Sequence, residues 1–396
     1  MVPCSVAISV RSDAMHGVGS WKLSGATLGL ALALVGCKGR NPSTEKPRTS
    51  APSTRPSASS APASSHPVAP PAPLPTPAAQ CKAVGQTGNV PLGTLRERKV
   101  QLLSEAGNLY ALGYTHELAR VRLLRISRSG GTFETIAEQP KAISEPSRAV
   151  LHDGAVYYTQ AGTFFRMGPQ TGESKALHSA ADSPPAVHGK HAYFVDCDRN
   201  GKTDRVVELA LTSGESRTLA EIEHQPKKRC QYSSLVADDR ELLIADWNGQ
   251  RVLAIAKDGG TVRELVRKRG FVQELMLEAD SLSFVSGRGL ERADRNGENA
   301  KLLVNDEKVS APWSAATLHS GEYWFIDNIA YTTTTHIFRM SAQGGKPQII
   351  AQFESKDPTA TNQGDEFLMS YVVDDACLYF VREVSGQPAQ LFARAK

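Results

Sequence analysis

The feature that most constrains the fold of this chain is an internal repeat. A glycine turn recurs at Gly131, Gly172, Gly214, Gly260, Gly297 and Gly345, in steps of 37 to 48 residues. Before each turn lies a short apolar or aromatic segment, with a further copy near the end of the chain: residues 108–112, 155–158, 192–196, 242–246, 281–285, 323–327 and 378–381. No stretch shows a sustained helical stripe. Short alternating strands and glycine turns at this period predict an all-β chain, a β-propeller with four strands in each blade.

The number of units predicts seven blades. The seventh unit ends after its third strand, at residues 391–394, whereas residues 93–96 near the start could supply the missing fourth strand. Strands from the two ends of the propeller domain would then close one blade together. Six blades is the alternative, if the first or last unit is an elaboration of the ring.

Two units carry residues that resemble a known repeat. Residues 242–249, which read LLIADWNG, and residues 323–327, which read YWFID, resemble the YWTD repeat of low-density-lipoprotein-receptor-type propellers. Asp196, Asp246 and Asp327 keep the motif aspartate, and the other units depart from it, so the six-blade count of that class does not transfer. The resemblance implies that these aspartates join neighbouring blades, and that the domain is a binding scaffold without a catalytic set.

The N-terminal region predicts export and lipidation. An apolar run that begins near Leu23 ends in Leu34-Val35-Gly36-Cys37, the form of a bacterial lipobox. The run is shorter than the roughly 20 residues of a membrane-spanning helix and has the parts of a secretory signal. We therefore expect residues 1–36 to be a signal peptide and Cys37 to be acylated, anchoring the protein in the cell envelope. An ordinary signal peptide is the alternative. Lys38 favours the outer membrane.

Residues 37–80 are expected to form a disordered tether. The 43 residues after Cys37 include 11 prolines, with Ser, Ala and Thr in most other positions. Such a sequence has little to bury and, at about 3.1 Å per residue, could extend on the order of 100 Å. Five basic residues and one acidic residue give the tether a charge of +4, equal to that of the whole chain. The domain at 81–396 is therefore close to neutral, and the basic pI does not indicate a nucleic-acid partner.

One loop has the spacing of a calcium site. Residues 196–204 read DCDRNGKTD, which would offer the side chains of Asp196, Asp198, Asn200 and Asp204 and the carbonyl of Lys202. Calcium binds several oxygens at such spacing, although the glutamate of the twelfth position is missing here. A structural Ca²⁺ is the prediction. A polar hairpin turn is the alternative.

Besides Cys37, which is expected to be acylated, four cysteines lie in the exported part of the chain, and they allow three pairings. Cys197 with Cys230 would join the second strand of one blade to the start of the next. Cys81 with Cys377 would fasten the N-terminal segment to the closing blade.

Two basic runs fall in consecutive links between blades. Lys227-Lys228-Arg229 and Arg267-Lys268-Arg269 could form a positive patch on one propeller face, beside the candidate calcium loop. Such a patch would suit an anionic glycan, lipid headgroups or an acidic protein. Ordinary solvated loops are the alternative.

Familiar enzyme motifs are missing from the sequence. It has no G-x-S-x-G, no H-E-x-x-H and no phosphate-binding glycine loop followed by Lys-Ser/Thr. The prediction is a membrane-anchored module that binds an envelope protein, a glycan or a small ligand. The alternative is a lyase or hydrolase acting on polysaccharide or peptide, with its site over the central channel. A cluster of His, Glu and Arg at one mouth of the channel would favour the enzyme, and a broad face without a pocket would favour binding.

Overall fold

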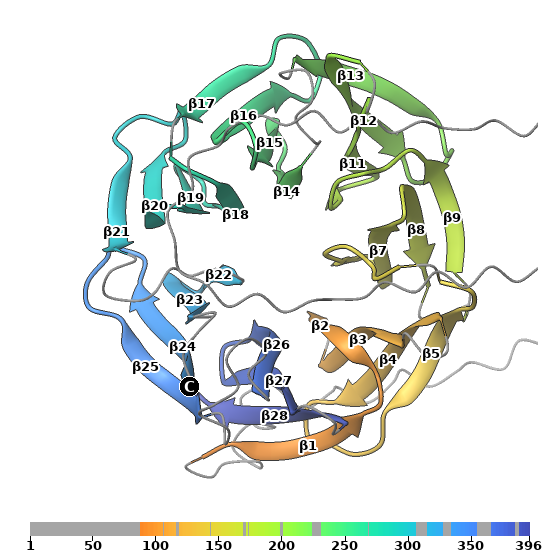
Figure 1. The fold of residues 1–396 in the computed structure, drawn as a ribbon, viewed down its shortest axis with the longest axis vertical. Coiled ribbons are helices and arrows are strands. Elements are labelled where there is room, and N and C mark those ends of the chain that lie inside the picture. The colour runs from red at the N-terminus through yellow and green to blue at the C-terminus, as the bar shows by residue number, and fades with distance from the viewer. Residues whose placement is uncertain are drawn as a thin grey trace, which may run out of the picture. The chain divides into compact units, whose positions relative to one another are not determined.

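The computed structural model describes residues 88–396 except 106, 116–118, 143, 169–171, 173, 199–200, 224–230, 268, 306–314, 328–333, 355–365 and 385–387. These residues form 28 strands in seven four-stranded antiparallel sheets, arranged as a ring (Figure 1). The described part contains no helix, so it offers none that could cross a membrane. The prediction of a seven-bladed propeller is confirmed, and the six-bladed alternative is wrong.

We number the blades in chain order, and each runs from its innermost to its outermost strand. Blade 1 holds β2 (Arg98–Glu105), β3 (Asn108–Thr115), β4 (Arg120–Ser127) and β5 (Glu134–Gln139). Blade 2 holds β6 (Val150–His152), β7 (Ala155–Gln160), β8 (Thr163–Met167) and β9 (Ser174–Ser179). Blade 3 holds β10 (Ala186–His188), β11 (His191–Asp196), β12 (Thr203–Ala210) and β13 (Ser216–Glu223). Blade 4 holds β14 (Tyr232–Ala237), β15 (Glu241–Asp246), β16 (Arg251–Ala256) and β17 (Arg263–Arg267).

The remaining blades follow the same plan. Blade 5 holds β18 (Val272–Leu277), β19 (Ser281–Ser286), β20 (Gly289–Asp294) and β21 (Lys301–Asn305). Blade 6 holds β22 (Ala316–His319), β23 (Glu322–Asp327), β24 (Thr334–Ser341) and β25 (Gln348–Glu354). Blade 7 holds β26 (Glu366–Val373), β27 (Cys377–Val384), β28 (Ala389–Ala395) and β1 (Val90–Leu95).

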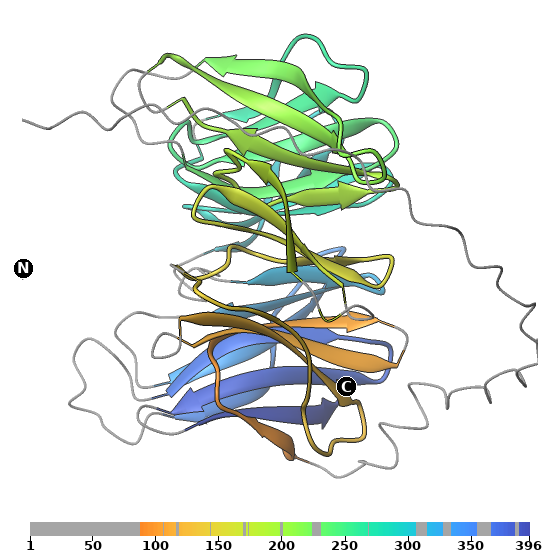
Figure 2. The same ribbon diagram turned by 90° about the vertical axis from the view of Figure 1, so that its right-hand side faces the viewer.

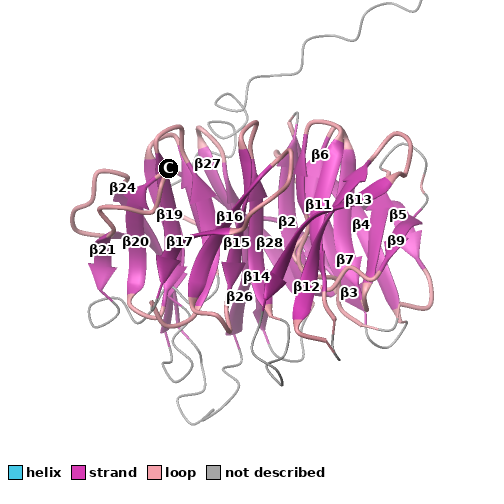
Figure 3. Ribbon diagram, turned by 90° about the horizontal axis from the view of Figure 1, so that it is seen from above, coloured by secondary structure: helices cyan, strands magenta, loops and turns pink. Residues whose placement is uncertain are grey.

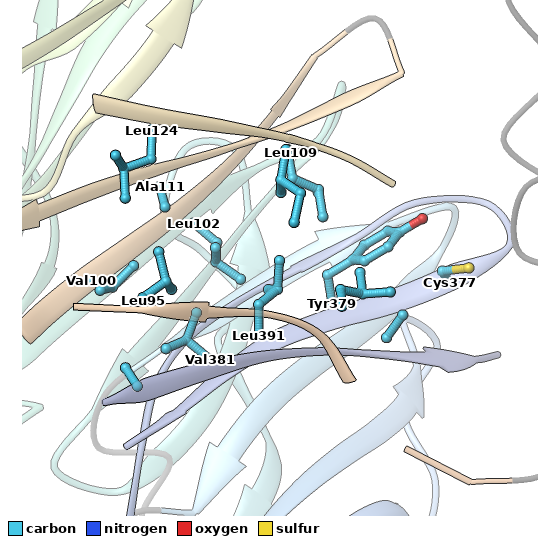
Figure 4. Close-up of a cluster of buried hydrophobic side chains, with 14 residues drawn as sticks. Leu95, Val100, Leu102, Leu109, Ala111, Leu124, Cys377, Tyr379, Val381 and Leu391 are labelled. Atoms are coloured by element: carbon cyan, nitrogen blue, oxygen red, sulfur yellow. The ribbon is translucent and has the colours of Figure 1, made fainter. Parts of the chain in front are cut away.

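Blade 7 closes the ring with strands from both ends of the domain. The strand β1 pairs antiparallel with β28, from Val90 opposite Ala393 to Leu95 opposite Ala389. Leu95 is 1% exposed and lies in one apolar cluster with Leu391 of β28 and Leu102 of blade 1 (Figure 4). The predicted closure is therefore confirmed.

The core consists of apolar layers between neighbouring blades. One layer contains Leu112 of blade 1 and Tyr158 of blade 2, and the next contains Tyr157 of blade 2 and Phe194 of blade 3. Every residue of β7 is buried, because its side chains point alternately toward one neighbouring blade and the other. The continuous apolar segments of the sequence are therefore second strands. Seen edge-on, the strands run between two faces that carry the turns (Figures 2 and 3).

Two of the motif aspartates bind within their own hairpins. Asp196 forms an ion pair with Arg205. Asp246 accepts hydrogen bonds from the Gly249 amide at 2.7 Å and from Arg251 at 2.8 Å. Arg251 also donates to the carbonyl of Glu223 in blade 3, so the arginine, rather than the aspartate, reaches the neighbouring blade. The side chain of Asp327 lies outside the described residues.

Candidate functional site

A pocket occupies part of the central channel. Its volume is about 340 Å³, near the lower end of the range for small-molecule sites. Five blades line it, through their innermost strands and the residues just before them: Leu102, Leu103, Ser104, Arg148, Ala149, Val150, Leu151, Pro184, Pro185, Ser234, Leu235, Val236 and Val372. Most of these side chains are apolar, and Arg148 is the only charged one among them.

The antiparallel register places equivalent residues of the seven blades around the channel. In each blade, the innermost strand turns into the second strand at a pair of residues three apart, such as Glu105 with Asn108 or His152 with Ala155. Corresponding pairs begin at His188, Asp238, Glu278, His319 and Asp374. We call the residue four positions before each turn the channel position. It is occupied, in blade order, by Gln101, Arg148, Pro184, Ser234, Glu274, Ala315 and Ser370.

At three channel positions a neutral polar side chain links two blades. Gln101 Oε1 accepts a hydrogen bond from the backbone amide of Ala149 at 2.7 Å. Ser370 Oγ likewise accepts from Leu102 at 3.0 Å, and Ser234 Oγ accepts from Leu275 at 3.3 Å. Each accepting side chain thus bonds a backbone amide of the following blade.

The two charged channel positions behave differently. Arg148 of blade 2 forms an ion pair with Glu274 of blade 5. These blades lie on opposite sides of the ring, where β18 is left of the centre in Figure 1 and β7, the strand beside β6, is right of it. The pair therefore crosses the channel. At the other linked positions, the donor is the backbone amide of the residue just after the channel position of the next blade. For Arg148 that residue is Pro185, which has no amide hydrogen to donate.

The ion pair combines burial with access to the channel. The Arg148 side chain remains 48% exposed although protein surrounds it, because the surface it exposes faces the channel, and the Glu274 side chain is 14% exposed. Desolvation lowers the pKa of Arg148, and the nearby Tyr371 hydroxyl acts in the opposite direction. The adjacent Glu274 carboxylate favours the charged form of the guanidinium.

Three histidines lie at the turns and not in the pocket. His152 Nε2 contacts the carbonyl of Gly189 in blade 3 at 2.8 Å. His188 Nε2 lies 2.9 Å from Asp239 in blade 4, and His319 Nε2 lies 3.1 Å from Asp375 in blade 7. Each occupies the same turn position of its blade and bridges to the next blade. They therefore join blades together and do not form the His–Glu–Arg cluster that would favour an enzyme.

The predicted calcium loop connects β11 to β12. Asp204 accepts hydrogen bonds from the Tyr232 hydroxyl at 2.7 Å and from the Asp198 amide at 3.0 Å, and Asp198 accepts one from the Gly201 amide. Burial raises the pKa of Tyr232, and its bond to Asp204 adds to the rise. Residues 88–396, as far as described, hold no group of three His, Cys, Asp or Glu side chains placed for a metal. Lys202 lies within the described residues, but Asn200 lies outside them, so the predicted set of ligands is described only in part. The calcium site therefore stays a prediction.

The other predicted sites are described only in part. Cys197 and Cys377 are each disulfide-bonded, whereas Cys81 and Cys230 lie outside the described residues, so the pairings stay predictions. Lys227, Lys228, Arg229, Lys268 and the lipobox with Cys37 also lie outside them. Arg267 pairs with Glu264, and Arg269 lies 3.4 Å from the fully buried Glu291.

Sequence alone could have singled out Arg148 and Glu274. When the seven units are aligned on their turns, only blades 2 and 5 have a charged residue at the channel position. The alignment does not reveal that the two residues meet, because that contact depends on the closure of the ring.

Comparisons with known proteins bear on the fold. No protein-family model matches the chain, and no curated protein matches its sequence. Among solved structures it is similar to the oligogalacturonate lyase of Vibrio parahaemolyticus (TM-score 0.52, 10% identity, 78% of this chain and 92% of that one). It is also similar to the AfRom2 CNH domain (TM-score 0.52, 8% identity, 78% and 99%) and to the Neurospora crassa Pan2 WD40 domain (TM-score 0.50, 11% identity, 76% and 89%). At such identities these likenesses show the propeller fold alone.

Proposed function

We propose that this protein is an envelope lipoprotein, anchored through Cys37, whose propeller binds a small ligand in its central channel. The observation that carries the proposal is the channel pocket of about 340 Å³, whose described lining is mostly apolar and includes one charged side chain, that of Arg148. A few well-placed polar groups in an apolar cavity are typical of small-molecule sites. The histidines at the turns are engaged between blades, which supports binding over catalysis.

Native mass spectrometry of the protein purified from its own host tests the pocket. We expect a bound small molecule on the wild-type propeller and none on Val236→Trp, because the indole would fill a pocket that Val236 lines. Ile349→Trp is the matched control, since Ile349 is 54% exposed on the outer strand β25 and should keep the ligand. A ligand that persists in Val236→Trp would place binding elsewhere.

Membrane fractionation tests the anchor. The wild-type protein should sediment with the membranes, and Cys37→Ser should release it to the soluble fraction, because acyl chains hold a protein far more firmly than an unmodified tether. Cys4→Ser is the control, since Cys4 precedes the predicted cleavage site. Equal sedimentation of both variants with the wild type would contradict lipidation at Cys37.

A further inference from the structure

The pair formed by Arg148 and Glu274 differs from the other contacts at the channel positions. Gln101, Ser234 and Ser370 each bind the adjacent blade, and their bonds hold the ring together. Arg148 and Glu274 instead meet across an open channel, where neither binds the backbone of the next blade in the contacts described. Pro185 removes the amide that a linking residue at position 148 would have satisfied. Arg148 therefore cannot make the bond to blade 3 that Gln101 makes to blade 2.

The surroundings of Arg148 suit an anion attached to an apolar body. The guanidinium lies in the pocket, and the walls around it include Leu103, Leu151 and Val236. A guanidinium presents its donors in a planar fork that matches a carboxylate, and such charge-assisted bonds are strong where water is scarce. A ligand carboxylate could therefore make with Arg148 the contact that Glu274 makes in the structure.

The charge of the site selects among anions. Arg148 and Glu274 together are neutral, so one entering carboxylate leaves a single net negative charge in the channel. A phosphate monoester would bring nearly two charges beside Glu274, with one arginine to balance them. Repulsion between like charges then disfavours the phosphate.

We propose that the pocket takes a small molecule with one carboxylate on an apolar body, and that this carboxylate binds Arg148 in place of Glu274. This inference rests on the proposed function, because it names the ligand class of the same pocket. Glu274 acts as a built-in competitor that occupies Arg148 while the pocket is empty.

Calorimetric titration of the full protein with hexanoate, hexan-1-ol and hexyl phosphate tests the inference. Hexanoate should bind best of the three. Glu274→Gln should bind hexanoate about 10-fold more tightly, because the competing carboxylate is gone. Glu278→Gln is the matched control: it removes a carboxylate of the same blade that is ion-paired with Arg292 and does not line the pocket, so affinity should not change.

Removal of the arginine needs a neutral background. Arg148→Gln alone would leave Glu274 without its partner and could unfold the protein, so the informative variant is Arg148→Gln combined with Glu274→Gln. Relative to Glu274→Gln, we expect it to lose about 10- to 100-fold in hexanoate affinity, as the loss of a charged hydrogen-bonded pair implies.

The outcomes separate the two proposals. Equal binding of hexan-1-ol and hexanoate in every variant would overturn the carboxylate inference and leave a ligand-binding pocket. Tighter binding of hexyl phosphate than of hexanoate would also overturn it. No bound molecule from the host and no binding of any probe would overturn the proposed function as well.

Discussion

At the scale of the residue, a buried ion pair joins the first and last blades. Arg128, just after β4, donates to Asp374, just after β26, at 2.7 Å, and the two residues are 6% and 9% exposed. The Asp374 carboxylate also accepts the backbone amides of Ala376 and Cys377. Arg128 is therefore the cation that faces this buried acid.

We therefore predict that Arg128→Met lowers the free energy of unfolding by about 3 kcal/mol, because it leaves a buried carboxylate without its counterion. Arg125→Met is the control, since Arg125 lies on β4, three residues before Arg128. Arg125 pairs with Glu134 at the surface, where the two side chains are 40% and 62% exposed, and its loss should cost less than about 1 kcal/mol. Urea unfolding of both variants measures the difference. Equal losses would mean that the Asp374 backbone bonds suffice without Arg128.

At the scale of the element, the sequence predicts the strands well and their irregularities poorly. The closure by β1 follows from a last unit that lacks a fourth strand, and Leu92 and Leu95 of β1 are both buried. The register shifts could not be foreseen. They occur in β1 between Pro91 and Gly93, and in several innermost strands, for example between Val272 and Leu275. Such bulges depend on packing against neighbouring strands, which the local alternation of side chains does not record.

At the scale of the whole molecule, the fold could be predicted because each blade repeats one local pattern, whereas the site depends on the ring. Arg148 and Glu274 are 126 positions apart and come together only when blades 2 and 5 face each other across the channel. His152, His188 and His319 look scattered in the sequence, yet the structure places them at one turn position in three blades. Equivalence between blades, more than proximity along the chain, identifies the residues that act together.

A contact between the turns of blade 6 and the closing blade involves a titratable acid, the exposed Asp375. The Asp375 carboxylate accepts hydrogen bonds from Ser320 Oγ and His319 Nε2, both at 3.1 Å. These bonds, the Ser320 hydroxyl first, hold the pKa of Asp375 below its ordinary value of 3.8. A carboxyl whose pKa is depressed in the fold stabilises it fully above the unfolded pKa, and the stabilisation is lost as the pH falls through the folded pKa.

We predict that Asp375→Asn lowers the melting temperature at about pH 7, and that the deficit against wild type shrinks as the pH falls below about 4, where the wild-type carboxyl becomes protonated too. Melting curves of both proteins across this range measure the effect. Asp280→Asn is the matched control, since Asp280 is an exposed acid in the corresponding turn region of blade 5, and its difference from wild type should stay small throughout. A deficit for Asp375→Asn that is the same at every pH would show that its contacts do not depend on the charge of the carboxylate. Packing and uncharged hydrogen bonds would then hold the turns of blades 6 and 7 together.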